Sequence, residues 1–116
     1  MRTRIKNPNR EIARLAFEKL VEKYNAKKTS EVVDFFGKRV RVDFGMALKN
    51  GTLGIIISDE IEFVGDRFIL GNIFEEAQRE FGKYYVSIAV MESLRAMGYR
   101  VSGKELEGGI LIEANR

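Results

Sequence analysis

Carboxylate, lysine, tyrosine and serine side chains are the groups in this chain that could do chemistry, because its 116 residues include no histidine and no cysteine. Most nucleophilic, acid–base and transition-metal chemistry near neutral pH uses imidazole or thiolate groups. Their absence excludes Ser-His and Cys-His catalytic pairs, zinc fingers, iron–sulfur sites and disulfides within the chain. Catalysis would have to come from paired carboxylates or from a desolvated lysine.

Two acidic residues lie in surroundings that could shift the pKa of their carboxyl groups: Asp43 in a predicted strand and Glu92 in a predicted apolar helix. Neither has a visible partner in the sequence, and the glycines lack the Walker spacing with its Lys-Ser or Lys-Thr pair. Tyr84 and Tyr85 lie at helical spacing among apolar residues, which favours core packing over base stacking or proton transfer. We therefore expect a protein that is not an enzyme, with no catalytic residue and no cofactor.

The acidic segment from Asp59 to Asp66 contains four carboxylates and no basic residue. Clustered oxygen ligands of this kind suit Mg²⁺ or Ca²⁺. However, Glu60 and Glu62 alternate with apolar residues, as in a half-exposed strand, and the spacing of an EF-hand is missing. The sequence favours an acidic edge that meets a basic segment over a metal site.

Positive charge is concentrated in the N-terminal quarter of the chain. Residues 1–28 hold nine Lys or Arg against three Glu, a balance of +6, so the remaining residues carry −3 of the net +3. A basic strand and helix of this kind could neutralise several phosphates and bind nucleic acid. The alternative is a solvated helix face in which Glu11, Glu18 and Glu22 pair with basic neighbours. The candidate nucleic-acid contacts are Arg2, Arg4, Lys6, Arg10 and Arg14.

The most apolar predicted element is a helix over residues 84–97. A helix that is apolar nearly all round is either buried on both sides or covers a partner. We expect one line of side chains on this helix to contact a second copy of the chain or another protein. The alternative is a central core helix wrapped by the sheet and by the first helix. The candidate contact residues are Val86, Val90, Leu94 and Met97.

The elements that must position these residues follow the order β-α-β-β-β-α-β-β, in one domain that spans residues 1–116. Asn7 before Pro8 predicts the start of the first helix, which Asn25 closes. Asn72 with Glu75 matches a capping box that opens the second helix. The six strands of this order are expected at 2–6, 38–44, 52–57, 61–64, 99–101 and 109–112, and residues 32–36 are a further candidate for a short strand.

Three local features complete this prediction. Val40, Val42 and Phe44 alternate with charged residues, so we place them on one face of a strand. Asn50-Gly51 is the strongest hairpin signal in the chain. Gly82 is expected to bend or interrupt the second helix, and Gly98 to end it.

These patterns predict an α+β fold, with a mostly antiparallel sheet packed against two main helices. Whether the strands form one sheet or two stays open. The longest apolar runs are far too short to span a bilayer, so we expect no membrane partner. Abundant Lys, Arg and Glu, with a single Gln, are typical of thermophilic proteins. A cytoplasmic location is the default expectation for a chain without a secretory signal.

The chain resembles a family of small proteins of unknown function, typified by an uncharacterised reading frame of chloroplast and cyanobacterial genomes. The resemblance is carried by Tyr84-Tyr85 before an apolar helix that ends in Met97-Gly98-Tyr99 and leads into a short hairpin. Weaker similarities are Thr3-Arg4-Ile5-Lys6 before the first helix and Lys49-Asn50-Gly51 between two strands. The segment 59–75 departs from the family pattern because it lacks aromatic character. The resemblance implies the architecture and no particular reaction.

Overall fold

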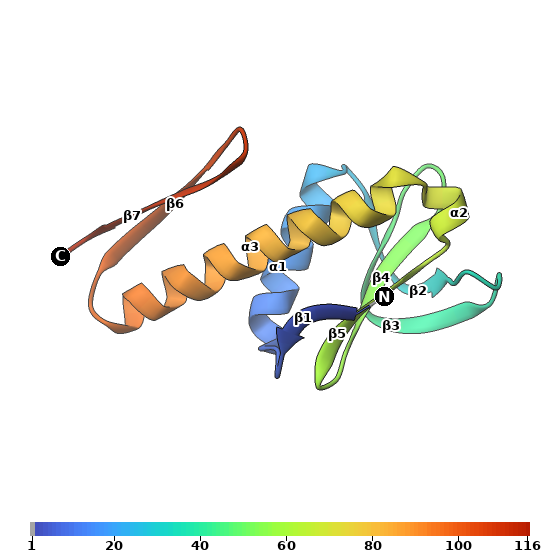
Figure 1. The fold of residues 1–116 in the computed structure, drawn as a ribbon, viewed down its shortest axis with the longest axis horizontal. Coiled ribbons are helices and arrows are strands. Elements are labelled where there is room, and N and C mark those ends of the chain that lie inside the picture. Colours follow the sequence, from blue (N-terminus) through green and yellow to red (C-terminus); the bar gives the residue numbers. More distant parts are fainter. Residues whose placement is uncertain (1) are drawn as a thin grey trace.

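The computed structural model describes residues 2–116, and the side chains from Ile5 onward. Within this range the chain forms seven strands and three helices, an α+β fold as predicted (Figure 1). In chain order they are β1 (Arg2–Lys6), α1 (Arg10–Lys23), β2 (Lys27–Val33), β3 (Arg39–Ala47), β4 (Thr52–Ile57), β5 (Glu60–Gly65), α2 (Arg67–Leu70), α3 (Asn72–Ala96), β6 (Arg100–Leu106) and β7 (Gly109–Asn115).

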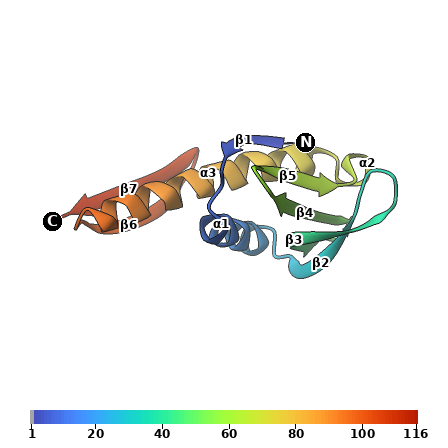
Figure 2. The same ribbon diagram turned by 90° about the horizontal axis from the view of Figure 1, so that it is seen from below.

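The described strands form two separate sheets, which answers the question that the sequence left open. One antiparallel sheet has the order β1-β5-β4-β3-β2, and β6 pairs only with β7. The main core lies between α1, α3 and one face of the larger sheet, around Leu20, Met46, Ile55 and Phe81. α3 runs along the length of the molecule, and β6–β7 lies beside its C-terminal half, away from the larger sheet (Figures 1 and 2). This half of α3 with β6–β7 is called the arm below.

The first helix begins two residues later than predicted, so the assignment of Asn7 as its cap is wrong. Asn7 has a φ of +48°, and its N–H donates to the Asp59 carbonyl at 2.8 Å, which makes it part of the turn after β1. The cap is Asn9, whose side-chain oxygen accepts the Ile12 N–H at 3.1 Å. Asn25 follows the end of the helix with a φ of +50°, as predicted for a closing residue.

The second long helix is uninterrupted, so the predicted break at Gly82 is wrong. α3 continues through Gly82 because its N-terminal half packs along the core, which offsets the cost of a glycine in a helix. The predicted capping box is also wrong, because α3 follows Gly71, which has a φ of +58°, without a side-chain cap. The short helix α2 comes first and is capped by Asp66. Gly98 ends α3 with a φ of +92°, as predicted.

β3 bends at a bulge, and this places Val42 and Phe44 on opposite faces of the sheet. Thr29 pairs with Gly45 but Glu31 pairs with Arg41, so β3 uses extra residues between the two pairs. The prediction that Val42 and Phe44 share a face is therefore wrong, because the bulge interrupts the alternation of side chains between Arg41 and Gly45. Phe44 packs against the main core, whereas Val42 does not belong to it.

The bulge folds the far half of the β2–β3 hairpin across the second face of the sheet. The Val33 N–H donates to the Thr52 hydroxyl of β4 at 2.8 Å. Val32 and Val42 are buried there, outside the main core. Gly45 and Gly54 pair with each other beneath Val42, and a Cβ on either would lie within 3.0 Å of its methyl groups. These two glycines allow the hairpin to approach the sheet.

Candidate functional site

The predicted contact helix carries an exposed apolar stripe on the arm. Val86, Val90 and Met97 expose 57%, 42% and 63% of their surface, and Leu94 is partly exposed beside them. They lie three or four residues apart, so their side chains form one line along α3. We call Val86, Val90, Leu94 and Met97 the arm stripe. The structure therefore brings together all four residues that the sequence singled out.

The polarity of this face of α3 changes at Val86. The same helical line carries Glu75, Arg79 and Lys83 along the half of α3 that lies on the larger sheet. Those residues are polar because that face of the helix meets solvent. Beyond Lys83 the face is equally open but apolar. The apolar character of the arm stripe is therefore not explained by packing within the described chain.

A shallow hollow of about 350 Å³ runs beside the arm stripe. Ile5 of β1 and Tyr85 border it on one side, and small residues of α3, Ala89 and Ser93, line its floor. Tyr85 is held in place because its hydroxyl accepts the Asn9 N–H at 2.8 Å. Val86, Val90 and Leu94 of the arm stripe also line this hollow, so the hollow and the stripe form one continuous surface.

The opposite side of α3 is covered by the β6–β7 hairpin. The Tyr84 hydroxyl donates to the Glu105 carboxylate at 2.8 Å, and Met91 packs against Gly103. Ile88 and Tyr84 are buried here, where they join the core that α1 and α3 share. The alternative of a wrapped core helix thus describes the first half of α3 and one side of the arm, while the stripe on the other side stays open.

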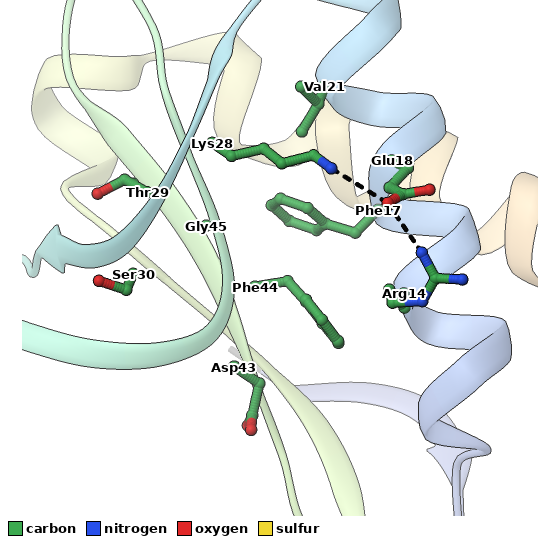
Figure 3. A pocket seen from close by; sticks show the side chains of 10 residues that line it. All are labelled: Arg14, Phe17, Glu18, Val21, Lys28, Thr29, Ser30, Asp43, Phe44 and Gly45. Carbon is green, nitrogen blue, oxygen red and sulfur yellow. Dashed lines mark hydrogen bonds and ion pairs between the residues drawn. The ribbon is translucent and has the colours of Figure 1, made fainter.

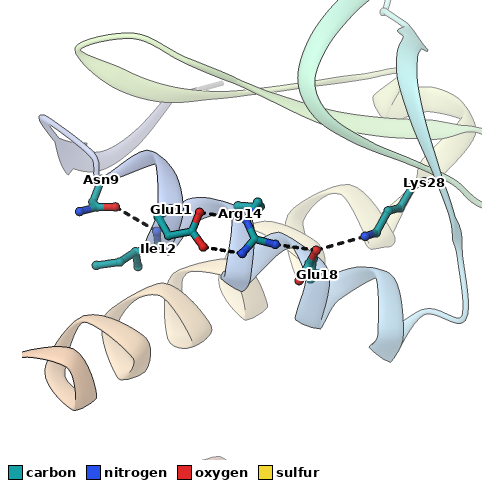
Figure 4. Close-up of polar contacts among 6 residues, drawn as sticks. All are labelled: Asn9, Glu11, Ile12, Arg14, Glu18 and Lys28. Atoms are coloured by element: carbon teal, nitrogen blue, oxygen red, sulfur yellow. Dashed lines mark hydrogen bonds and ion pairs between the residues drawn. The ribbon is translucent and has the colours of Figure 1, made fainter. Parts of the chain in front are cut away.

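Arg10 and Arg14, the two candidate contacts on α1, are paired with carboxylates. Arg10 binds Asp43 at 2.7 Å. Figure 4 shows that Arg14 binds both Glu11 and Glu18, the latter at 2.9 Å. This pairing offsets the charge that Arg10 and Arg14 could offer to phosphates. The geometry favours the interleaved, solvated face over a nucleic-acid interface.

The remaining candidate nucleic-acid contacts lie on β1. Lys6 is exposed, and its backbone pairs with Glu60 of β5. The side chains of Arg2 and Arg4 lie outside the described residues. The backbone of Arg2 pairs with Glu62, so the acidic strand β5 meets the basic strand β1 along their shared edge, as predicted. No group of three or more acidic side chains with the geometry of a metal site occurs among the described residues.

A second hollow, of about 430 Å³, opens where α1 meets the bulge of β3 (Figure 3). Phe17 and Phe44 form its apolar floor, with ring centroids 6.5 Å apart. Lys28 extends from β2 past the Phe17 ring to Glu18, which is on α1, at 3.1 Å (Figure 3). We call this hollow the α1–β3 pocket. The residues that line it are Arg14, Phe17, Glu18, Val21, Lys28, Thr29, Ser30, Asp43, Phe44 and Gly45.

Hydrogen bonding from cations favours the charged form of Glu11 and Glu18 on α1 and of Asp43 on β3. The Lys28 ammonium lowers the pKa of Glu18, and the Arg14 guanidinium lowers the pKa of Glu11. At Asp43, partial burial acts to raise the pKa, but hydrogen bonds from Arg10 and from the Ile57 N–H outweigh it and hold the pKa below its usual value. These acids therefore stay ionised at neutral pH.

The pKa values of two tyrosines are raised, whereas those of the acids are lowered. Burial raises the pKa of Tyr24 and of Tyr84, and hydrogen bonds to Glu76 and Glu105 raise them further. A general acid or base needs a pKa near the working pH. Each of these shifts moves a group away from neutrality, which is the pattern of structural pairing rather than of a catalytic site.

The sequence analysis did not identify two exposed phenylalanine side chains, Phe36 and Phe68, which we call the aromatic tips. Phe36 and Phe68 each expose 88% of their surface. The strand predicted at 32–36 is wrong, because β2 ends at Val33 and the Asp34 carboxylate turns the chain by accepting the Phe36 N–H at 2.9 Å. Asp66 accepts the Phe68 N–H at 2.9 Å in the same way. The repeated pattern Asp-x-Phe at 34–36 and 66–68 was the signal that could have found both tips.

Comparison of the chain with family models, with curated proteins and with solved structures finds no match. The resemblance to the chloroplast and cyanobacterial family therefore stays a prediction. Among the described residues, no helix has the length and apolar character needed to span a bilayer.

Proposed function

We propose that this chain is a non-catalytic interaction module that docks a second copy or another protein through the arm stripe. The observation that carries this proposal is the change of polarity along one face of α3. Exposed charged residues give way to exposed Val86, Val90 and Met97 without any change in the exposure of that face. Monomeric proteins seldom leave such a continuous apolar surface uncovered.

The helix-in-groove mode of recognition suits this surface. Anchors three and four residues apart on one helix pack against the apolar face of another element. The small side chains of Ala89 and Ser93 allow a close approach, and Ile5 extends the contact to β1. The paired carboxylates and high tyrosine pKa values support a module without acid–base chemistry.

The test is sedimentation velocity across a wide range of protein concentration, on the wild-type chain and on Val90→Lys. We expect the wild type to associate and Val90→Lys to weaken association at least about tenfold, because burying an unpaired ammonium in an apolar interface costs several kcal/mol. Ile69→Lys is the matched control, since it places the same charge at an exposed apolar residue on α2, away from the arm.

A wild-type chain that stays monomeric would exclude the second copy as the partner. If the partner is another protein, we expect it to bind the wild type and Ile69→Lys but not Val90→Lys. Loss of binding with Ile69→Lys alone would contradict the proposal and place the interaction surface at the aromatic tips.

A further inference from the structure

The α1–β3 pocket has the composition of a small-molecule site and is separate from the arm stripe. Its volume of about 430 Å³ lies within the range of roughly 300 to 1,000 Å³ that is typical of ligand pockets. Its floor is aromatic and its rim is charged, so a ligand could bury an apolar body and keep a polar group at the opening. The bulge of β3 creates this space, because it turns the hairpin away from α1.

The ion pairs at the rim identify the charge that a ligand would carry. Arg14 is bound by two carboxylates, and Arg10 is bound by Asp43 and lies 5.0 Å from the Phe44 ring centroid. Lys28 differs, because its single partner is the Glu18 oxygen that already accepts from Arg14. Lys28 is also the most exposed of these cations, at 68%, so its ammonium can move to a new anion at low cost.

We propose that the α1–β3 pocket binds a small organic anion with a flat apolar body, such as an aromatic carboxylate. The body would lie on Phe17 and Phe44 with Val21 at its side, and the carboxylate would accept from Lys28. Glu18 would keep its bond to Arg14, so no buried charge loses its partner. An organic cation would instead meet the two cations that line the pocket, Arg14 and Lys28.

The test is a titration of the ¹⁵N-labelled full chain with 1-naphthoate, followed by amide chemical shifts. We expect saturable shifts at Phe17, Val21 and residues 28–30 and 43–45. The neutral 1-naphthalenemethanol should bind about fivefold more weakly, as expected for the loss of one partly exposed ion pair. The cationic 1-naphthylmethylammonium should bind more weakly still.

Lys28→Met tests the role of the ammonium, because it keeps the apolar stem and removes the charge. It should lower the affinity for 1-naphthoate about fivefold and leave that for 1-naphthalenemethanol unchanged. Lys27→Met is the matched control, since Lys27 is the exposed neighbour that does not line the pocket. Equal affinity for the three naphthalene compounds, shifts confined to the arm stripe, or no saturable binding would each overturn the proposal.

Discussion

Gly45 is the residue on which the curvature of the larger sheet most depends. Its place between Thr29 and Val42 leaves no room for a side chain, since a Cβ would lie 2.7 Å from the Thr29 carbonyl oxygen. The backbone at Thr29 cannot move aside for this Cβ as the end of a flexible side chain could. The fold therefore needs glycine here for space and not for an unusual φ.

We predict that Gly45→Ala destabilises the protein by about 2 kcal/mol, the usual cost of overpacking a tight site. Gly82→Ala should stabilise it by about 0.5–1 kcal/mol, because Gly82 lies in a helix and a Cβ there meets nothing within 4 Å. Urea unfolding of the two variants measures both effects. Equal destabilisation by the two substitutions would contradict the close approach at Gly45.

Asp43 links α1 to the point where β3 and β4 separate. One carboxylate oxygen accepts from Arg10 and the other accepts the Ile57 N–H at 2.7 Å. Because its pKa is lower in the folded state, ionised Asp43 stabilises the protein above the pKa of the unfolded chain. That stability is lost as the pH falls through the lower folded pKa.

Asp43→Asn should therefore cost about 1 kcal/mol at pH 7 and much less once the pH is below the folded pKa. The free energy of unfolding, measured from pH 7 down to strong acid, checks this difference. Asp59→Asn at an exposed turn is the control and should change little at either end. A cost that does not change with pH would show that the charge of Asp43 is unimportant.

At the scale of elements, helix starts were the least predictable feature. The sequence offers three asparagines near helix starts, and only Asn9 caps a helix with its side chain. Asn7 before Pro8 matches the local rule equally well, but the bond from its N–H to the Asp59 carbonyl commits it to a turn. That bond joins residues far apart in the chain, so local pattern could not reveal it.

Asn9→Ala should destabilise the protein by about 1 kcal/mol, because the Ile12 N–H loses its acceptor. Asn72→Ala should cost at most a few tenths of a kcal/mol, since Asn72 lies inside α3 and forms no cap. Thermal or urea unfolding of both variants compares the two asparagines directly. A larger loss with Asn72→Ala would restore the capping box that the sequence suggested.

At the scale of the whole molecule, the arm and the larger sheet differ in how they are supported. The larger sheet is covered by helices on one face and by its own folded hairpin on the other. The arm has a two-stranded hairpin on one side of α3, and on the other side the arm stripe stays exposed, with Ile5 of β1 beside it. With dimensions of 51 × 30 × 21 Å, the molecule is elongated along α3, which presents the arm stripe away from the larger sheet (Figures 1 and 2).

The sequence by itself determined the features that depend on neighbouring residues. Alternation predicted β1 and β5. Asn50-Gly51 predicted β4 and the β3–β4 turn, where the Leu48 N–H donates to the Gly51 carbonyl at 2.7 Å. Helical spacing predicted the arm stripe as a line of apolar residues. The absence of His and Cys limited the available chemistry before any geometry was known.

Only the tertiary structure decided which of these faces stay open. The α1–β3 pocket exists because a bulge separates β3 from α1. At its rim, Lys28 of β2 donates a hydrogen bond to Glu18 of α1. Arg10 and Asp43, which are 33 positions apart, form an ion pair. This pair offsets the positive charge of Arg10, which the sequence analysis treated as available for binding phosphates. Periodicity records which residues share a face of one element, but exposure depends on which elements meet, and that is set by contacts distant in the chain.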